Sequence, residues 1–156
     1  MHVDIETTLD YGEGCHFGPD IRDFEAEPRR THYFQHDRQL CLNWGLPGDR
    51  TTCLYHSPFL TWPAADDAHS LESLHFTALQ ADGQGLAHFN LGQSGYAFEQ
   101  AESGGRHVLA FAPNDYLYGK KEKLVLTGTQ RHHCRIVPYA GDWREVGLPM
   151  LATEFR

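Results

Sequence analysis

Apolar and polar residues alternate along the start of the chain. From Val3 to Leu9 every second side chain is polar or charged, so an extended segment there would have one face in water. Similar short runs recur at Gln39–Trp44, Thr52–Tyr55, Leu74–Leu79, Leu86–Asn90, Tyr96–Glu99, His107–Phe111, Leu124–Leu126 and His133–Tyr139. Residues that form turns separate these runs. Such spacing is typical of a sandwich or barrel, and we predict an all-β fold, an antiparallel β-sandwich.

Helical signals are few. The best one begins at Asp142, which can cap a short helical turn while Glu145 reaches back in a capping box. Pro149 argues against a long helix there, because an internal proline removes a hydrogen bond. The segment 12–30 is rich in glycine, proline and acidic residues and predicts a long loop. A length of 156 residues fits one sandwich domain over 1–156.

Charge and composition narrow the class of protein. A formal net charge of -8 disfavours binding to nucleic acid, which depends on clustered Lys and Arg. No apolar run is long enough for a membrane helix and no signal peptide precedes the first strand, so we expect a cytoplasmic protein without membrane contact. The four cysteines form no C-x-x-C pair, and we expect reduced thiols. They are Cys15, Cys41, Cys53 and Cys134.

Eleven histidines raise the question of a metal site. His32 and His36 have the i, i+4 spacing of a helical pair, but their surroundings favour a solvated loop or strand. His132 and His133 are adjacent, so on a strand they point to opposite faces. A zinc site assembled from separate strands, with Cys134 or His107, stays open as a lesser alternative.

Carboxylates and aromatic residues offer two further kinds of site. Glycosidases use two carboxylates, but the aspartates here have neighbours typical of turns and caps. They are Asp66, Asp67, Asp115 and Asp142. Trp44, Trp62 and Trp143 suit the core, or platforms on which sugar rings stack. We predict Trp62 as the exposed one, because it lies between Pro58 and Pro63 in a segment that resists regular strand pairing.

The C-terminal third carries a pattern that points to a family. Five segments follow one another along the chain: GLAHFNLGQSGYAFEQ, HVLAFAP, LTGTQRHHC, RIVPYAGDW and REVGLPMLATEF. Together they resemble the C-terminal β-sandwich region of glycoside hydrolase family 38 α-mannosidases. The resemblance extends over residues 53–156 and is loose before that. In it, Asn90, Gly92, Gly95 and Tyr96 mark a hairpin, while Asp142 and Trp143 fix the exit from the last strand.

This resemblance implies a fragment of a galactose-mutarotase-like supersandwich without catalytic residues of its own. The family's zinc ion and nucleophile belong to a separate α/β domain, whose H-x-D-x-x-W signature is only half matched by His2 and Asp4, since Thr7 stands in place of the tryptophan. No cofactor is therefore expected in this chain, and zinc is expected in the partner domain.

We therefore expect an accessory domain that packs on a mannosidase-like catalytic domain and contributes to carbohydrate binding. The candidate sugar-binding residues are Trp62, Tyr139, Asp142 and Trp143. Family members continue past the position of Arg156, so an exposed apolar face or strand edge predicts self-association. Two alternatives remain, an independent carbohydrate-binding β-sandwich and a His-rich metal-binding module.

Overall fold

The computed structural model describes residues 1–14, 39–48, 51–66, 68, 71–99, 104–111 and 126–155. Most of the predicted loop 12–30 lies outside these ranges. So do several residues weighed for metal binding or catalysis, namely Cys15, His32, His36, Asp67 and Asp115.

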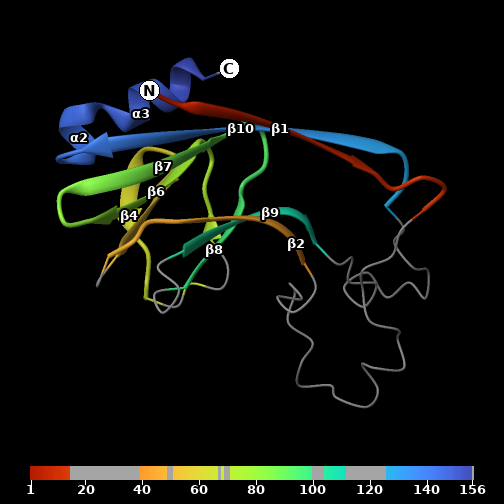
Figure 1. Ribbon diagram of the computed structural model, residues 1–156, viewed down its shortest axis with the longest axis horizontal. Helices are drawn as coiled ribbons and strands as arrows, with labels where there is room; N and C mark the ends of the chain where they lie inside the picture. Colours follow the sequence, from red (N-terminus) through yellow and green to blue (C-terminus); the bar gives the residue numbers. More distant parts are fainter. Residues whose placement is uncertain are drawn as a thin grey trace, which may run out of the picture.

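The described strands form two antiparallel sheets, which confirms the predicted all-β sandwich (Figure 1). The larger sheet has six strands in the order β1 (Val3–Asp10), β10 (Thr129–Ala140), β7 (Gln84–Asn90), β6 (Phe76–Ala81), β3 (Thr52–Ser57) and β4 (Leu60–Pro63). The smaller sheet has four, in the order β2 (Gln39–Gly45), β9 (Gly104–Phe111), β8 (Gly95–Glu99) and β5 (Leu71–Glu72). Two short helices, α2 (Trp143–Val146) and α3 (Leu148–Glu154), cover the outer face of the larger sheet.

The segment around Trp62 corrects one expectation. Leu60–Pro63 does pair as a strand, antiparallel to β3, with Trp62 opposite Tyr55. It is the last strand of its sheet, so only one of its sides needs hydrogen bonds, and an edge strand tolerates Pro63 at its end. The two-residue strand β5 was also missed, because its only signal is its pairing with β8.

The connection from Asn90 to Gly95 corrects a second expectation. It is not a hairpin, because β7 pairs with β6 and β10 in the larger sheet while β8 pairs with β5 and β9 in the smaller one. The turn therefore carries the chain from one sheet to the other. The true hairpin lies one strand earlier, between β6 and β7, where Asp82 and Gly83 both have positive φ, 51° and 74°. Asp-Gly with two positive φ angles is the sequence favoured by the tightest hairpins.

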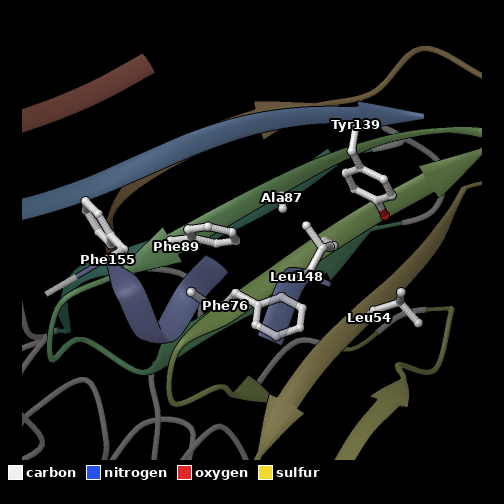
Figure 2. Packing of buried hydrophobic residues seen from close by; sticks show 9 residues of the cluster. Leu54, Phe76, Ala87, Phe89, Tyr139, Leu148 and Phe155 are labelled. Atoms are coloured by element: carbon white, nitrogen blue, oxygen red, sulfur yellow. The ribbon is translucent and has the colours of Figure 1, made fainter. Parts of the chain in front are cut away.

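The main apolar core lies between the helices and the larger sheet (Figure 2). Alternation along β7 places Ala87 and Phe89 on this face, and Leu148 and Phe155 meet them from the helical segment. Tyr139 lies over Gly85, where an added Cβ would come within 2.0 Å of the tyrosine ring. The buried members are Leu54, Phe76, Ala78, Ala87, Phe89, Tyr139, Leu148, Ala152 and Phe155.

The space between the two sheets has an apolar part and a polar part. One part is apolar, with Cys53, Leu79 and Phe98 buried together. The other part is polar and contains His88, Asn90, Tyr96 and His107. The inner face of a small sandwich thus holds two histidines that are 0% and 1% exposed.

The C-terminal helices partly match the sequence. Asp142 caps α2 as expected, its Oδ1 accepting from the backbone N–H of Arg144 at 2.7 Å. Gly147, with φ of 74°, ends this helix in the left-handed conformation. The second helix was missed, because Pro149 was taken as a stop. Proline is tolerated in the first turn of a helix, where its missing N–H is not needed, and α3 begins in this way.

Candidate functional site

The turn between β3 and β4 presents a strained, exposed aromatic residue. Pro58 and Phe59 form the two-residue connection between the paired residues Ser57 and Leu60. Phe59 has φ of 97°, a backbone region that costs a residue with a Cβ about 1–2 kcal/mol and that normally selects glycine. Its side chain is 99% exposed, so no contact within the described chain compensates for this strain.

Trp62 extends the apolar surface along the edge strand. Its side chain is 48% exposed and that of Leu60 is 54% exposed. These two residues are separated by one position, so they share a face of β4. We call Pro58, Phe59, Leu60 and Trp62 the apolar hairpin. An exposed cluster of large apolar side chains at a sheet edge is typical of a contact surface for a protein or a ligand.

The other three predicted sugar-binding residues have structural contacts. The Tyr139 side chain is buried in the main core. Asp142 caps α2 and forms an ion pair with Arg144 at 3.1 Å. Trp143 packs against the main core, and the Arg144 guanidinium lies 4.4 Å from the centre of its ring.

These three residues do not share a site with Trp62. Trp62 lies opposite Tyr55 on β3, and Tyr55 points to the face opposite that of its neighbour Leu54. Leu54 belongs to the core under the helices, as do Tyr139 and Trp143. Trp62 therefore faces the other side of the larger sheet, and its strand lies four positions from β10 in the strand order.

The polar part between the sheets forms a second candidate site, which we call the inner polar cluster: His88, Asn90, Tyr96 and His107. The Asn90 amide donates to the Tyr96 hydroxyl oxygen at 2.7 Å, and His88 Nδ1 lies 3.0 Å from the same oxygen. The His107 ring stacks on Tyr96 with centroids 4.7 Å apart and lies 4.5 Å from the His88 ring.

The protonation states of the two histidines follow from these contacts. His107 Nε2 lies 3.2 Å from the Gln93 carbonyl oxygen, which can only accept, so Nε2 carries the proton. This leaves His107 Nδ1 and His88 Nε2 buried without a partner in the described part of the chain. Burial lowers the pKa of His107 from 6.5 to about 4, and burial followed by the neighbouring His107 lowers the pKa of His88 well below 6.5. Both imidazoles are neutral at physiological pH.

The described residues do not form a metal centre. Within the described ranges, no three His, Cys, Asp or Glu side chains are grouped so as to hold an ion. His132 and His133 point to opposite faces as expected, since His132 is buried while His133 is exposed and lies beside Phe155. Cys134 is a free thiol whose pKa burial raises to about 11, so it is protonated at neutral pH and is a poor ligand or nucleophile.

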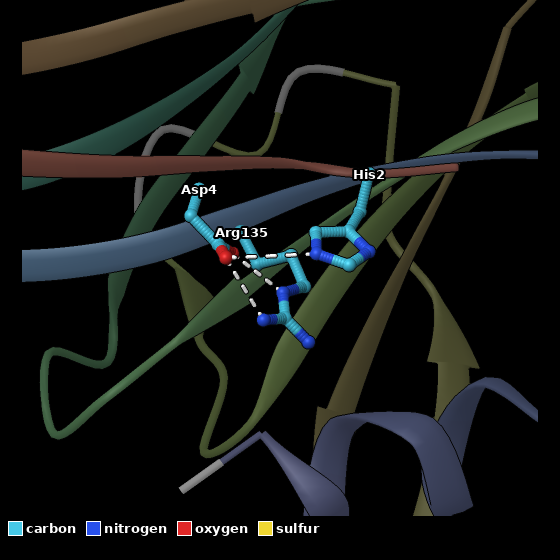
Figure 3. Close-up of polar contacts among 3 residues, drawn as sticks. All are labelled: His2, Asp4 and Arg135. Atoms are coloured by element: carbon cyan, nitrogen blue, oxygen red, sulfur yellow. Dashed lines mark hydrogen bonds and ion pairs between the residues drawn. The ribbon is translucent and has the colours of Figure 1, made fainter.

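Asp4 binds both His2 and Arg135, and its contact with Arg135 joins β1 to β10 (Figure 3). Asp4 on β1 lies directly opposite Arg135 on β10, and two hydrogen bonds of 2.5 and 2.9 Å join the carboxylate to the guanidinium. The hydrogen bond from Arg135 holds the pKa of Asp4 below its usual value. His2 Nε2 lies 3.6 Å from the same carboxylate, and Arg135 also lies over Phe155 at 4.6 Å. Asp4 is thus engaged in holding the sheet edge.

Sequence reasoning missed Phe59, His88 and the internal contacts of Tyr96. No local pattern marks Phe59, because its φ angle depends on the hairpin that forms around it. His88 had a signal in the sequence. Leu86, His88 and Asn90 occupy alternate positions of one predicted strand, so their side chains share a face. The sequence of β7 alone does not show which of its two faces packs against a second sheet.

No protein-family model matches the sequence, and no curated protein matches it either. Across the residues that the structure describes, no helix has the length and apolar character needed to cross a membrane.

Proposed function

We propose that this chain is an accessory β-sandwich of an α-mannosidase-like glycoside hydrolase, which packs on a separate α/β catalytic domain through the apolar hairpin. The observation that carries this proposal is Phe59, which combines a positive φ with a side chain that is 99% exposed. Backbone strain of this kind is concentrated at sites of contact and binding, because the interaction made there compensates for its cost. The cytoplasmic location belongs to the same proposal.

The residues that carry the family resemblance support a structural role for the chain. Asn90 and Tyr96 join the two sheets through a side-chain hydrogen bond, and Gly92 takes a φ of 88° in the turn between them. Asp142 and Trp143 follow the end of β10 and begin α2. The resemblance therefore falls on residues that form the fold, and hydrolysis would rely on the zinc ion and carboxylates of the partner domain.

Complementation in trans tests the proposal. The purified chain is expected to leave aryl α-mannosides intact, with or without added zinc. The partner is a family 38 α/β domain that lacks its own β-sandwich, and mixing it with this chain is expected to produce turnover. Phe59→Ser and Trp62→Ala should each weaken the complex at least tenfold, which corresponds to about 1.4 kcal/mol of lost apolar contact.

A matched control comes from the opposite face of the molecule. Met150 on α3 is 71% exposed, and Met150→Ser removes a similar apolar surface away from the hairpin. This variant should bind the catalytic domain as the unchanged chain does. Turnover by the chain alone, or equal weakening by Met150→Ser, would contradict the proposal.

Trp62 favours a second candidate, an independent carbohydrate-binding module. A half-exposed indole on an edge strand provides a flat apolar face on which the C–H groups of a sugar can stack. In this case the isolated chain would bind immobilised glycans as a monomer, and Trp62→Ala would abolish the binding. Under the accessory proposal the isolated chain instead self-associates through the uncovered hairpin, which light scattering detects, and retains no glycan.

A further inference from the structure

A pocket of about 290 Å³ opens where the smaller sheet meets the start of β10. It shares no residue with the apolar hairpin and draws its walls from three parts of the chain. The first part is the turn that leads into β8, the second is strand β9, and the third runs from Leu126 into the start of β10. The lining residues are Gln93, Ser94, Gly95, Val108, Leu109, Leu126 and Gln130. The volume is at the small end of the range for ligand pockets, about 300–1,000 Å³, and suits a ligand with a single ring.

Hydrogen bonds fix the walls of this pocket. Gln93 is held twice, because its carbonyl oxygen accepts from His107 Nε2 at 3.2 Å and its side-chain amide donates to the Leu109 carbonyl at 3.0 Å. The Ser94 carbonyl accepts from the backbone N–H of Ser73 at 2.8 Å. Gln130 lies opposite Leu9 in the ladder between β1 and β10. The pocket is thus formed in advance, which reduces the entropy lost on binding.

The lining defines the chemistry of a suitable ligand. None of the seven residues carries a charge, so a charged ligand would lose its hydration without gaining a counter-charge. Ser94 has a hydroxyl and Gln130 a primary amide, and each group can both donate and accept, as alcohol hydroxyls do. Neither side chain forms a hydrogen bond within the part of the chain that the structure describes. Val108, Leu109 and Leu126 provide apolar surface for C–H groups.

We propose that this pocket binds a neutral ring bearing several hydroxyl groups, the chemical class of a monosaccharide, with the Ser94 hydroxyl and the Gln130 amide as its polar partners. This site is independent of the accessory role, since it lies on other elements and needs no catalytic domain.

The test is a titration of the isotopically labelled full chain, followed by the backbone and side-chain amide signals. The probes are a methyl hexopyranoside, the corresponding uronate with a carboxylate on the same ring, and cyclohexanol with one hydroxyl. The hexopyranoside is expected to give saturable shifts at Gln93, Ser94 and Gln130. The uronate and cyclohexanol should each bind at least tenfold more weakly.

Two variants locate the interaction. Gln130→Leu and Ser94→Ala each remove one hydrogen-bonding group, and each should weaken hexopyranoside binding about tenfold, which corresponds to about 1.4 kcal/mol. Gln84→Leu makes the same exchange at an exposed position in the β6–β7 hairpin and should bind as the unchanged chain does.

Several results would overturn the inference. They are the absence of saturable shifts, equal binding of the uronate or cyclohexanol, and shifts confined to residues 57–63 of the apolar hairpin. Should Gln130→Leu fail to fold, unchanged binding by Ser94→Ala would be sufficient to reject the site.

Discussion

Acid should destabilise this protein through His107 more than through any surface histidine. The ring is 1% exposed, and the titratable groups that face it are His88, Tyr96 and His132. None of these is negatively charged at pH 7, and the hydrogen bond to the Gln93 carbonyl offsets only part of the cost of burying a positive charge. Burial accordingly lowers the pKa of His107 to about 4, from 6.5 in the unfolded chain.

The sign and size of the effect follow from this difference. Between pH 6.5 and 4 the unfolded chain binds a proton at His107 that the folded protein does not bind, so stability falls as pH falls through that window. A shift of this size corresponds to about 3 kcal/mol, a large share of the 5–15 kcal/mol typical of a domain. His88 has a lowered pKa as well and adds a loss of the same sign.

Urea unfolding, followed by tryptophan fluorescence from pH 7.5 to pH 4, measures this loss directly. The informative variant is His107→Gln, whose amide can still donate to the Gln93 carbonyl but does not titrate. We expect the variant to lose about 3 kcal/mol less than the unchanged chain between pH 6.5 and 4. His133→Gln removes an exposed imidazole from β10, beside Phe155 on the face of the larger sheet that the helices cover, and should retain the full acid effect. An unfolding free energy that is independent of pH in this window, or the same slope in His107→Gln, would refute the reasoning.

Three further predictions concern single substitutions. Gly85→Ala should lower the free energy of unfolding by about 1–3 kcal/mol, because its Cβ would overlap the Tyr139 ring; an unchanged urea midpoint would show that the ring moves aside freely. Phe59→Gly should leave the free energy of unfolding unchanged or raise it by up to about 1 kcal/mol, whereas a loss of several kcal/mol would mean that the ring packs within the protein. Asp4→Asn should speed amide hydrogen exchange along β1, since Arg135 loses its charged partner, and equal exchange rates would show that backbone pairing alone holds this strand.

The strands that were predicted correctly are those whose local pattern of apolar and polar residues is sufficient to identify them. Alternation located β1, and the short apolar run Leu74–Leu79 located most of β6, without any knowledge of their partners. What sequence did not predict depends on pairing over long distances. The turn from Asn90 to Gly95 has the residues of a hairpin, yet the following strand joins another sheet. Glycines permit a tight turn, but they do not determine which strand pairs with the next one.

The same distinction separates the candidate sites. Trp62 was predicted as exposed because a pattern of neighbouring prolines marked its segment, although the reason given, a failure to pair, was wrong. The inner polar cluster and the pocket at Gln130 exist only after β7, β9 and β10 have come together from different parts of the chain.

The apolar hairpin and the inner polar cluster lower the stability of the isolated chain in opposite ways. The hairpin exposes large apolar groups to water, whereas the cluster buries polar groups, two of them imidazole nitrogens without a partner in the described residues. Each arrangement lowers the stability of the isolated chain, the first through strain and exposed apolar surface, the second through desolvation. A surface interaction would relieve the first cost but not the second, because the cluster lies between the sheets. The two features therefore call for separate explanations, and a partner that covers Phe59 should leave the acid sensitivity of His107 intact.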